Sequence, residues 1–291
     1  MSIRIVTDTA SDYTLEEAKK RNITLLPLTV SFEDDHYKDL YELDHNAFFT
    51  KLIETDIFPR TSLIPPYDYE EIFRKILDEG DDIICITLSS KLSGCYQSAC
   101  IAAQIDPARI RVIDSLNATI GEKILCEIAA DLIEKDKGMD EIEHELLEER
   151  GNVQIIALVN TLEYLKKGGR ISSGAAIAGT VLSIKPVIKL KDGEIVSVGT
   201  ARGSRNANNK LIELVRDAGG IDFNKPFYLA YSGLSREILD KYITDSSCLY
   251  SHIKAEDLPV STIGSTIGTH LGPGAIGFAF CANNKPETQS N

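Results

Sequence analysis

The chain has 291 residues, of which 43% are hydrophobic and 26% charged, so it can bury a full core and is long enough for two domains of ordinary size. Its 31 Lys and Arg residues stand against 44 Asp and Glu residues, and the net charge of -13 repels a phosphate backbone or an anionic membrane surface. Composition therefore excludes a disordered chain and argues against nucleic-acid binding.

Targeting and redox features of the sequence predict a cytoplasmic protein. Residues 1–8 have neither the longer apolar region nor the cleavage site of a signal peptide, and no apolar stretch reaches the about 18 to 20 residues of a membrane span. The six cysteines form no CxxC pair and no cluster with histidine at metal-ligand spacing. We therefore expect reduced thiols, no metal on this chain and no stable membrane insertion.

The first half of the chain alternates short β-branched runs with longer amphipathic segments, the pattern of βαβ units that form a mainly parallel sheet. The expected strands are residues 3–6, 24–32, 82–88 and 110–113. The expected helices are residues 15–21, 45–54, 67–79, 93–105, 119–135 and 140–150. The segment 58–66 is rich in proline and is predicted to be a loop without regular structure.

A shift in composition at Gly151 marks the predicted domain boundary. We expect an N-terminal α/β domain over residues 1–150, a C-terminal α/β domain over residues 151–282 and a polar tail over residues 283–291. The second domain is expected to contain strands 153–159, 227–231 and 275–281 and helices 161–167, 172–182, 204–218 and 235–244. A hairpin over residues 187–198 turns at Asp192-Gly193, a dipeptide suited to positive backbone angles.

Two glycine patterns have the spacing of nucleotide-binding motifs but not their context. Residues 272–277 fit GxGxxG, yet an apolar strand-like run follows where the dinucleotide motif opens a helix. Residues 174–180 have the glycine spacing of a P-loop without its lysine. We therefore expect no nucleotide site and no cofactor on this chain.

The segment 88–99 delivers several hydroxyls and a glycine from a buried strand onto the first turn of a helix. Unpaired N–H groups at such a turn stabilise a carboxylate or phosphate, and the hydroxyl of Ser93 adds a donor. A plain N-cap explains the same serine. A third interpretation is that Ser93 is the nucleophile of a serine hydrolase. The sequence has no GxSxG motif, however, and its histidines have no evident acid partner.

One histidine stands apart from the others. Four of the five lie in charged or polar settings and are predicted at the surface: His36, His45, His144 and His252. His270 lies among the closely spaced glycines of residues 267–274, which predict a tight loop that a ligand can approach. Its imidazole would either hydrogen-bond to an anion or pair with it near neutral pH, or simply pack the loop.

Five segments of the sequence together resemble the DegV family, whose members include the fatty-acid-binding subunits of bacterial fatty acid kinase. The similarity spans nearly the whole chain, and it depends on the order and spacing of the segments. They are residues 5–12, 60–62 with the prolines behind them, 88–98, 164–172 and 267–277.

The resemblance implies two α/β domains with one long-chain fatty acid held between them, its tail in an apolar tunnel. Around its carboxylate the resemblance places the hydroxyl of Thr61 or Ser62, the hydroxyl of Ser93 with the amide of Gly94, and the imidazole of His270. Such donors are needed because an ionised carboxylate buried without partners is strongly destabilising. The preferred chain length stays open.

The resemblance also implies the reaction. A partner kinase, which would carry ATP and Mg²⁺, phosphorylates the bound carboxylate, and this chain carries the acyl phosphate toward an acyltransferase of phospholipid synthesis. The chain is then a non-catalytic subunit, and Arg170 faces the partner unless it forms a buried salt bridge. Two other hypotheses stay open: a stand-alone acyl hydrolase that uses Ser93, and a structural or regulatory protein whose apolar cleft is only a domain interface.

Overall fold

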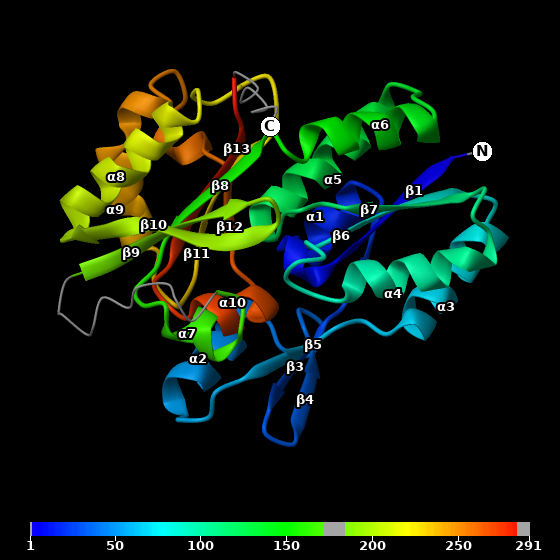
Figure 1. Ribbon diagram of the computed structural model, residues 1–291, viewed down its shortest axis with the longest axis horizontal. Coiled ribbons are helices and arrows are strands. Elements are labelled where there is room, and N and C mark those ends of the chain that lie inside the picture. Colours follow the sequence, from blue (N-terminus) through cyan, green and yellow to red (C-terminus); the bar gives the residue numbers. More distant parts are fainter. Residues whose placement is uncertain (1, 172–183, 284–291) are drawn as a thin grey trace, which may run out of the picture.

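Among the described residues, three β-sheets organise the fold, and two of them pack against the same long helix, α5 (Thr119–Glu134) (Figure 1). The computed structural model describes residues 2–171 and 184–283. None of the helices in these two ranges combines the length and the apolarity that a bilayer crossing needs.

The first sheet has four strands, all parallel to their neighbours. Their order is β2 (Ile23–Leu26), β1 (Ile3–Asp8), β6 (Asp82–Thr87) and β7 (Ile110–Asp114). Helices cover both faces of this sheet, which is why its strands are apolar on both sides. One face is covered by α3 (Pro66–Asp78) and α4 (Cys95–Ala102), and the other by α1 (Leu15–Lys20), α5 and α6 (Met139–Glu149).

The second sheet has six strands and is antiparallel except for its last pair. Their order is β10 (Glu194–Arg202), β9 (Ile184–Lys191), β8 (Val153–Leu158), β13 (Ile276–Cys281), β11 (Phe227–Tyr231) and β12 (Val260–Thr262). Helices α8 (Ser204–Asp217) and α9 (Glu237–Asp245) pack on the face turned away from α5 (Figure 1). One face of each of these two sheets therefore packs into the hydrophobic core around α5.

A third, smaller sheet lies beside short helices at the lower edge of the molecule in Figure 1. Its strands are β4 (Asp35–Lys38), β3 (Thr29–Phe32) and β5 (Arg60–Ser62), and α2 (His45–Glu54) packs on it. Helix α10 (Ser265–Leu271) contacts α2, β3, β5 and α7 (Glu163–Lys167), so it joins the third sheet to the second half of the chain.

The predicted α/β class with a mainly parallel first sheet is confirmed. The hairpin is confirmed as well, because Asp192 and Gly193 both have positive φ between β9 and β10. The boundary at Gly151 stays a prediction. The hydrophobic core around α5 contains side chains from both sides of it, such as Ile84 and Ile155. The expected helix 172–182, the glycine pattern 174–180 and most of the polar tail lie outside the described residues.

Two predictions of strand and loop boundaries in the first half of the chain are wrong. Residues 24–32 are not one strand, because Pro27 interrupts the run and the chain leaves the first sheet after β2 to enter the third sheet as β3. The proline-rich loop contains the strand β5, which pairs with β3. Pro59 and Pro65 flank this strand without entering it, so every residue of β5 keeps its backbone N–H.

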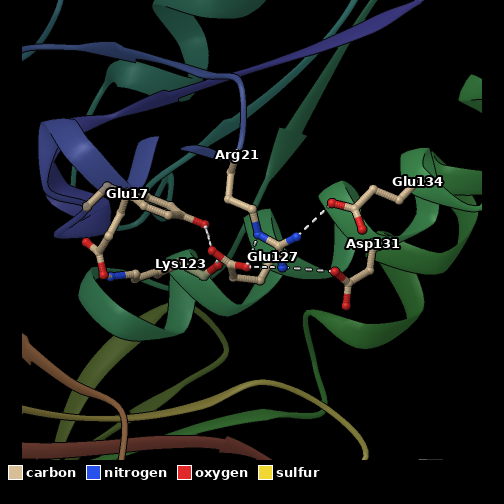
Figure 2. Close-up of polar contacts among 7 residues, drawn as sticks. Glu17, Arg21, Lys123, Glu127, Asp131 and Glu134 are labelled. Atoms are coloured by element: carbon tan, nitrogen blue, oxygen red, sulfur yellow. Dashed lines mark hydrogen bonds and ion pairs between the residues drawn. The ribbon is translucent and has the colours of Figure 1, made fainter. Parts of the chain in front are cut away.

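A cluster of charged side chains links α1 to α5 on the side of the first sheet that faces α5 (Figure 2). Arg21 donates to Glu127 at 2.7 Å, to Asp131 at 2.9 Å and to Glu134 at 2.9 Å. The hydroxyl of Tyr13 donates to the second oxygen of Glu127 at 2.7 Å. These contacts satisfy a carboxylate that is 7% exposed and attach the start of the chain to the central helix.

Substitution of Arg21 by alanine is expected to destabilise the protein by about 2 kcal/mol, because charge-assisted hydrogen bonds are lost and a nearly buried carboxylate keeps fewer donors. Denaturant unfolding measures the change. Arg74→Ala is the control, since Arg74 forms an exposed pair with Glu70 one helical turn away, and its loss should be below about 0.5 kcal/mol. Equal losses in the two variants would contradict the role given to Arg21.

Candidate functional site

A cavity of about 410 Å³ lies where the carboxyl ends of the first sheet's strands meet the second sheet and α10. Its volume is in the range of pockets that hold small organic ligands. Most of its lining is apolar and comes from both halves of the chain: Leu28, Leu88, Ile120, Ile155, Leu165, Ile188, Leu190, Ile195, Ile263, Ile267 and Leu271, among others.

The polar lining of this cavity contains every candidate that the sequence analysis named. These residues come from β5, from the start of α4, from the segment after α7 and from the end of α10: Thr61, Ser62, Ser93, Gly94, Arg170 and His270. They are far apart in sequence, and tertiary folding brings them to one cavity. Their roles toward a ligand stay predictions.

His270 lies in the last turn of α10, so the predicted tight loop is wrong at this position and begins only at Gly272, whose φ is +69°. Its Nε2 is 2.9 Å from the Thr61 hydroxyl. Neighbouring residues of a strand point to opposite sides, so this contact favours Thr61 over Ser62 as the inward-facing hydroxyl. A Cβ at Gly168 would lie 2.2 Å from Nδ1 of His270, so glycine there leaves room for the ring.

Burial, together with the positive charge of Arg170, lowers the pKa of His270 to about 4. The imidazole is therefore neutral at pH 7. Of the two possibilities that the sequence left open for an anion, this finding favours a hydrogen bond from a neutral ring over an ion pair.

Ser93 precedes the N-cap of α4, which is Gly94 and has no side-chain cap. The Ser93 hydroxyl has long contacts, 3.4 Å to the amide of Cys95 and 3.3 Å to its sulfur. Gly94, and not Ser93, is therefore the N-cap residue, although the Ser93 hydroxyl accepts a long hydrogen bond from the first amide of the helix. Leu63, which is 45% exposed, lies over this turn, because a Cβ at Gly94 would be 2.7 Å from its Cδ2.

Arg170 is half-buried and its guanidinium donates to two backbone carbonyl groups, at Leu92 with 3.2 Å and at Gly168. Burial lowers the pKa of this arginine. Within the described residues its contacts include no carboxylate, so the buried salt bridge is not supported there. Its positive charge lies beside the cavity.

Two buried aspartates that the sequence analysis did not assign hold the start of α10. Asp39 accepts from the backbone amides of Ser265 and Thr266 at 3.2 Å each, and from the Ser265 hydroxyl. Asp12 accepts from the amide of Gly264 at 2.8 Å. Asp12 lies in residues 5–12, one of the segments that carry the family resemblance, whereas no sequence signal singled out Asp39.

His45 was predicted at the surface and is half-buried. Its Nδ1 is 2.8 Å from the carbonyl oxygen of Ile263, and its Nε2 is 2.9 Å from that of Gly233. The prediction failed because its polar sequence neighbours lie on the exposed side of α2, while the ring packs against Phe49 and Tyr231.

The hydrolase hypothesis requires a nucleophile hydrogen-bonded to a base that a third group orients. In the part of the chain that the structure describes, the Ser93 hydroxyl contacts Cys95 and the His270 ring contacts Thr61. No cluster of three potential metal ligands occurs among the described residues. The arrangement offers hydrogen-bond donors and a positive charge in the lining of a mainly apolar cavity, which suits binding of an amphipathic anion.

Comparison with known proteins identifies the family of this chain. A family model described as "Uncharacterised protein, DegV family" matches residues 2–283. The chain belongs to the DegV family. A DegV domain-containing protein of Caldanaerobacter subterraneus subsp. tengcongensis is 33% identical over 280 residues, which is 96% of this chain and 98% of that protein.

Solved structures of the DegV family show the same fold. One from Thermus thermophilus, described as a fatty-acid-binding DegV family protein, is 32% identical with a TM-score of 0.86, covering 97% of this DegV chain and 100% of its own. A stearic acid-binding protein from Eubacterium ventriosum is 26% identical with a TM-score of 0.82, covering 96% and 97%.

The protonation of His270 is directly testable by NMR of its ring in the ligand-free protein. We expect a titration near pH 4, and a higher value in Arg170→Gln because a neighbouring positive charge is removed. Since the folded pKa lies below the ordinary 6.5, His270 reduces stability as the pH falls from about 6.5 to about 4. Arg74→Gln is the distant control. A ring that titrates near pH 6.5 in the unliganded wild type would refute the buried neutral imidazole.

Proposed function

We propose that this chain binds one long-chain fatty acid in the cavity. The acyl chain lies along the apolar lining, and the carboxylate lies at the end formed by Thr61, Ser93, Gly94 and His270. The observation that supports this proposal is the division of one cavity into an apolar body and a cluster of donors from four separate segments. Relatives that bind fatty acids share the fold over nearly the whole chain.

The energetics of such a ligand agree with this division. Each buried methylene contributes about 0.8 kcal/mol, so a 16-carbon tail supplies roughly 10 kcal/mol before ordering costs. The carboxylate needs donors, because its desolvation is costly without them. Two hydroxyls, the uncapped start of α4 and a neutral imidazole supply hydrogen bonds, and Arg170 adds a nearby positive charge.

We further propose that the bound acid is presented to a fatty acid kinase in the cytoplasm. ATP and Mg²⁺ bind to the kinase, the acyl phosphate stays on this chain, and an acyltransferase of phospholipid synthesis consumes it. Exposed Ser62 and Leu63 and half-buried Ser93 place the polar end of the cavity near the surface, where a partner can reach it. Arg170, at the same end, is the residue that we propose to face that partner.

Denaturation and solvent extraction of the purified protein are expected to release about one fatty acid per chain, identified by mass spectrometry. After lipid removal, the wild type should bind a fluorescent fatty acid, and Ser93→Ala with His270→Ala should weaken binding roughly 10-fold to 100-fold, because donors to the carboxylate are lost. Ser90→Ala is the matched control, since Ser90 is exposed on the same turn.

Binding of the methyl ester of the same acid separates the contribution of the head group from that of the tail. The double variant should lose less affinity for the ester than for the acid. A wild type that releases no lipid and binds none would instead support a cavity that is only a domain interface.

The carrier step is measured with the kinase subunit, ATP and Mg²⁺, and the acyl phosphate that forms is trapped as the hydroxamate. Ester hydrolysis by the isolated chain, abolished in Ser93→Ala, would favour the hydrolase.

A further inference from the structure

The floor of the cavity contains a row of three small residues on adjacent strands of the second sheet. Ala230 on β11 is paired with Gly277 on β13, and Gly277 is paired with Ala157 on β8. Paired residues of antiparallel strands point to the same face of a sheet. All three residues line the cavity, so they form one continuous low strip beneath it.

Larger side chains bound this strip. Ile188 on β9 is paired with Ala157 and continues the row with a branched side chain. Ile155 lies two positions before Ala157 on β8 and therefore points to the same face. Both isoleucines also line the cavity. The floor is thus low over three adjacent strands and higher at Ile188 and Ile155, which both lie next to Ala157.

Gly277 is the informative member of the row, because glycine in the middle of a strand is destabilising and often marks a close approach of a ligand. Its φ is not in the positive region that favours glycine. A Cβ at this position would meet Ile120 at 3.9 Å and Ala157 at 4.0 Å, which are ordinary contacts. Neither the backbone nor the packing of the described residues therefore requires glycine at this position.

Other glycines near the cavity are different. A Cβ at Gly268 would lie 2.7 Å from the ring of Phe48, and one at Gly121 would lie 2.3 Å from Ile155. Those two glycines are explained by close packing. At Gly277 no side chain fills the space beside the strand, so this volume belongs to the cavity. It lies next to the Cδ1 of Ile120 on α5.

We propose that Ala157, Ala230 and Gly277 determine the ligand specificity of this chain, because the low floor that they form sets the longest acyl chain that the cavity accepts. This inference rests on the proposed binding of a fatty acid and concerns its tail alone, since none of the three residues has a polar side chain. One added side-chain carbon displaces about one methylene of the ligand in a closely packed cavity.

The test compares Gly277→Ala and Ala157→Val with the wild type, using saturated acids of about 12 to 20 carbons that displace a fluorescent fatty acid from lipid-free protein. We expect the affinity for the longest bound acid to fall roughly 4-fold in Gly277→Ala and roughly 15-fold in Ala157→Val, which adds two carbons. Acids that leave the floor unoccupied, at the short end of the series, should keep their affinity within about 2-fold.

Gly151→Ala is the matched control, because a Cβ at Gly151 meets nothing within 4 Å and the position lies outside the cavity. Its chain-length profile should match that of the wild type. Wild-type binding with an unchanged length profile in both floor variants would overturn the inference and leave the proposed function standing. A uniform loss at every chain length would also overturn it, because it would indicate general destabilisation. A wild type that binds none of the acids would overturn the proposed function and the inference together.

Discussion

The candidate site depends on how the first turn of α10 is held. Asp12 and Asp39, from the first half of the chain, accept hydrogen bonds from the amides of residues 264–266. Burial raises the pKa of Asp12 to about 7 and also raises that of Asp39, so both carboxyl groups are in an environment that disfavours charge. The amides offset part of this penalty and fix the helix. As a result, His270 at the other end of α10 lies against Thr61.

The two large sheets make different contributions to the cavity. The parallel sheet supplies the loops after its strands, where backbone amides and hydroxyls are available, as at Ser93 and Gly94. The antiparallel sheet supplies a regular apolar face whose height varies with side-chain size, low at Gly277 and higher at Ile155. Helix α5 packs against both sheets and sets their separation. In the proposed complex, different parts of the fold would therefore bind the charged head and the apolar tail of the ligand.

Neutral His270 has a consequence for how an anion is bound. An imidazolium beside Arg170 would place two positive charges in a half-buried region, and burial together with that arginine shifts the ring to its neutral form. The carboxylate of an amphipathic ligand would then meet one fixed positive charge and several hydrogen-bond donors. In the proposed complex, the ligand would be held without a buried ion pair between His270 and the carboxylate.

The sequence by itself determined the α/β class and most helices and strands, because hydrophobic periodicity and turn chemistry are local properties. Ser93 and His270 stood out in their local sequence, whereas Thr61, Ser62 and Arg170 were named only through the resemblance to the DegV family. The prediction that the proline-rich segment 58–66 has no regular structure failed at β5, since flanking prolines do not prevent three residues from pairing with β3. The sequence placed His45 at the surface, since the polar residues around it along the chain do not reveal which residues pack on its ring. Only the tertiary structure decided that Asp39 holds α10 and that Ala157, Ala230 and Gly277 share one row. Strand register and contacts between distant segments are set by the packing of the whole chain, and one sequence does not encode them in any local pattern.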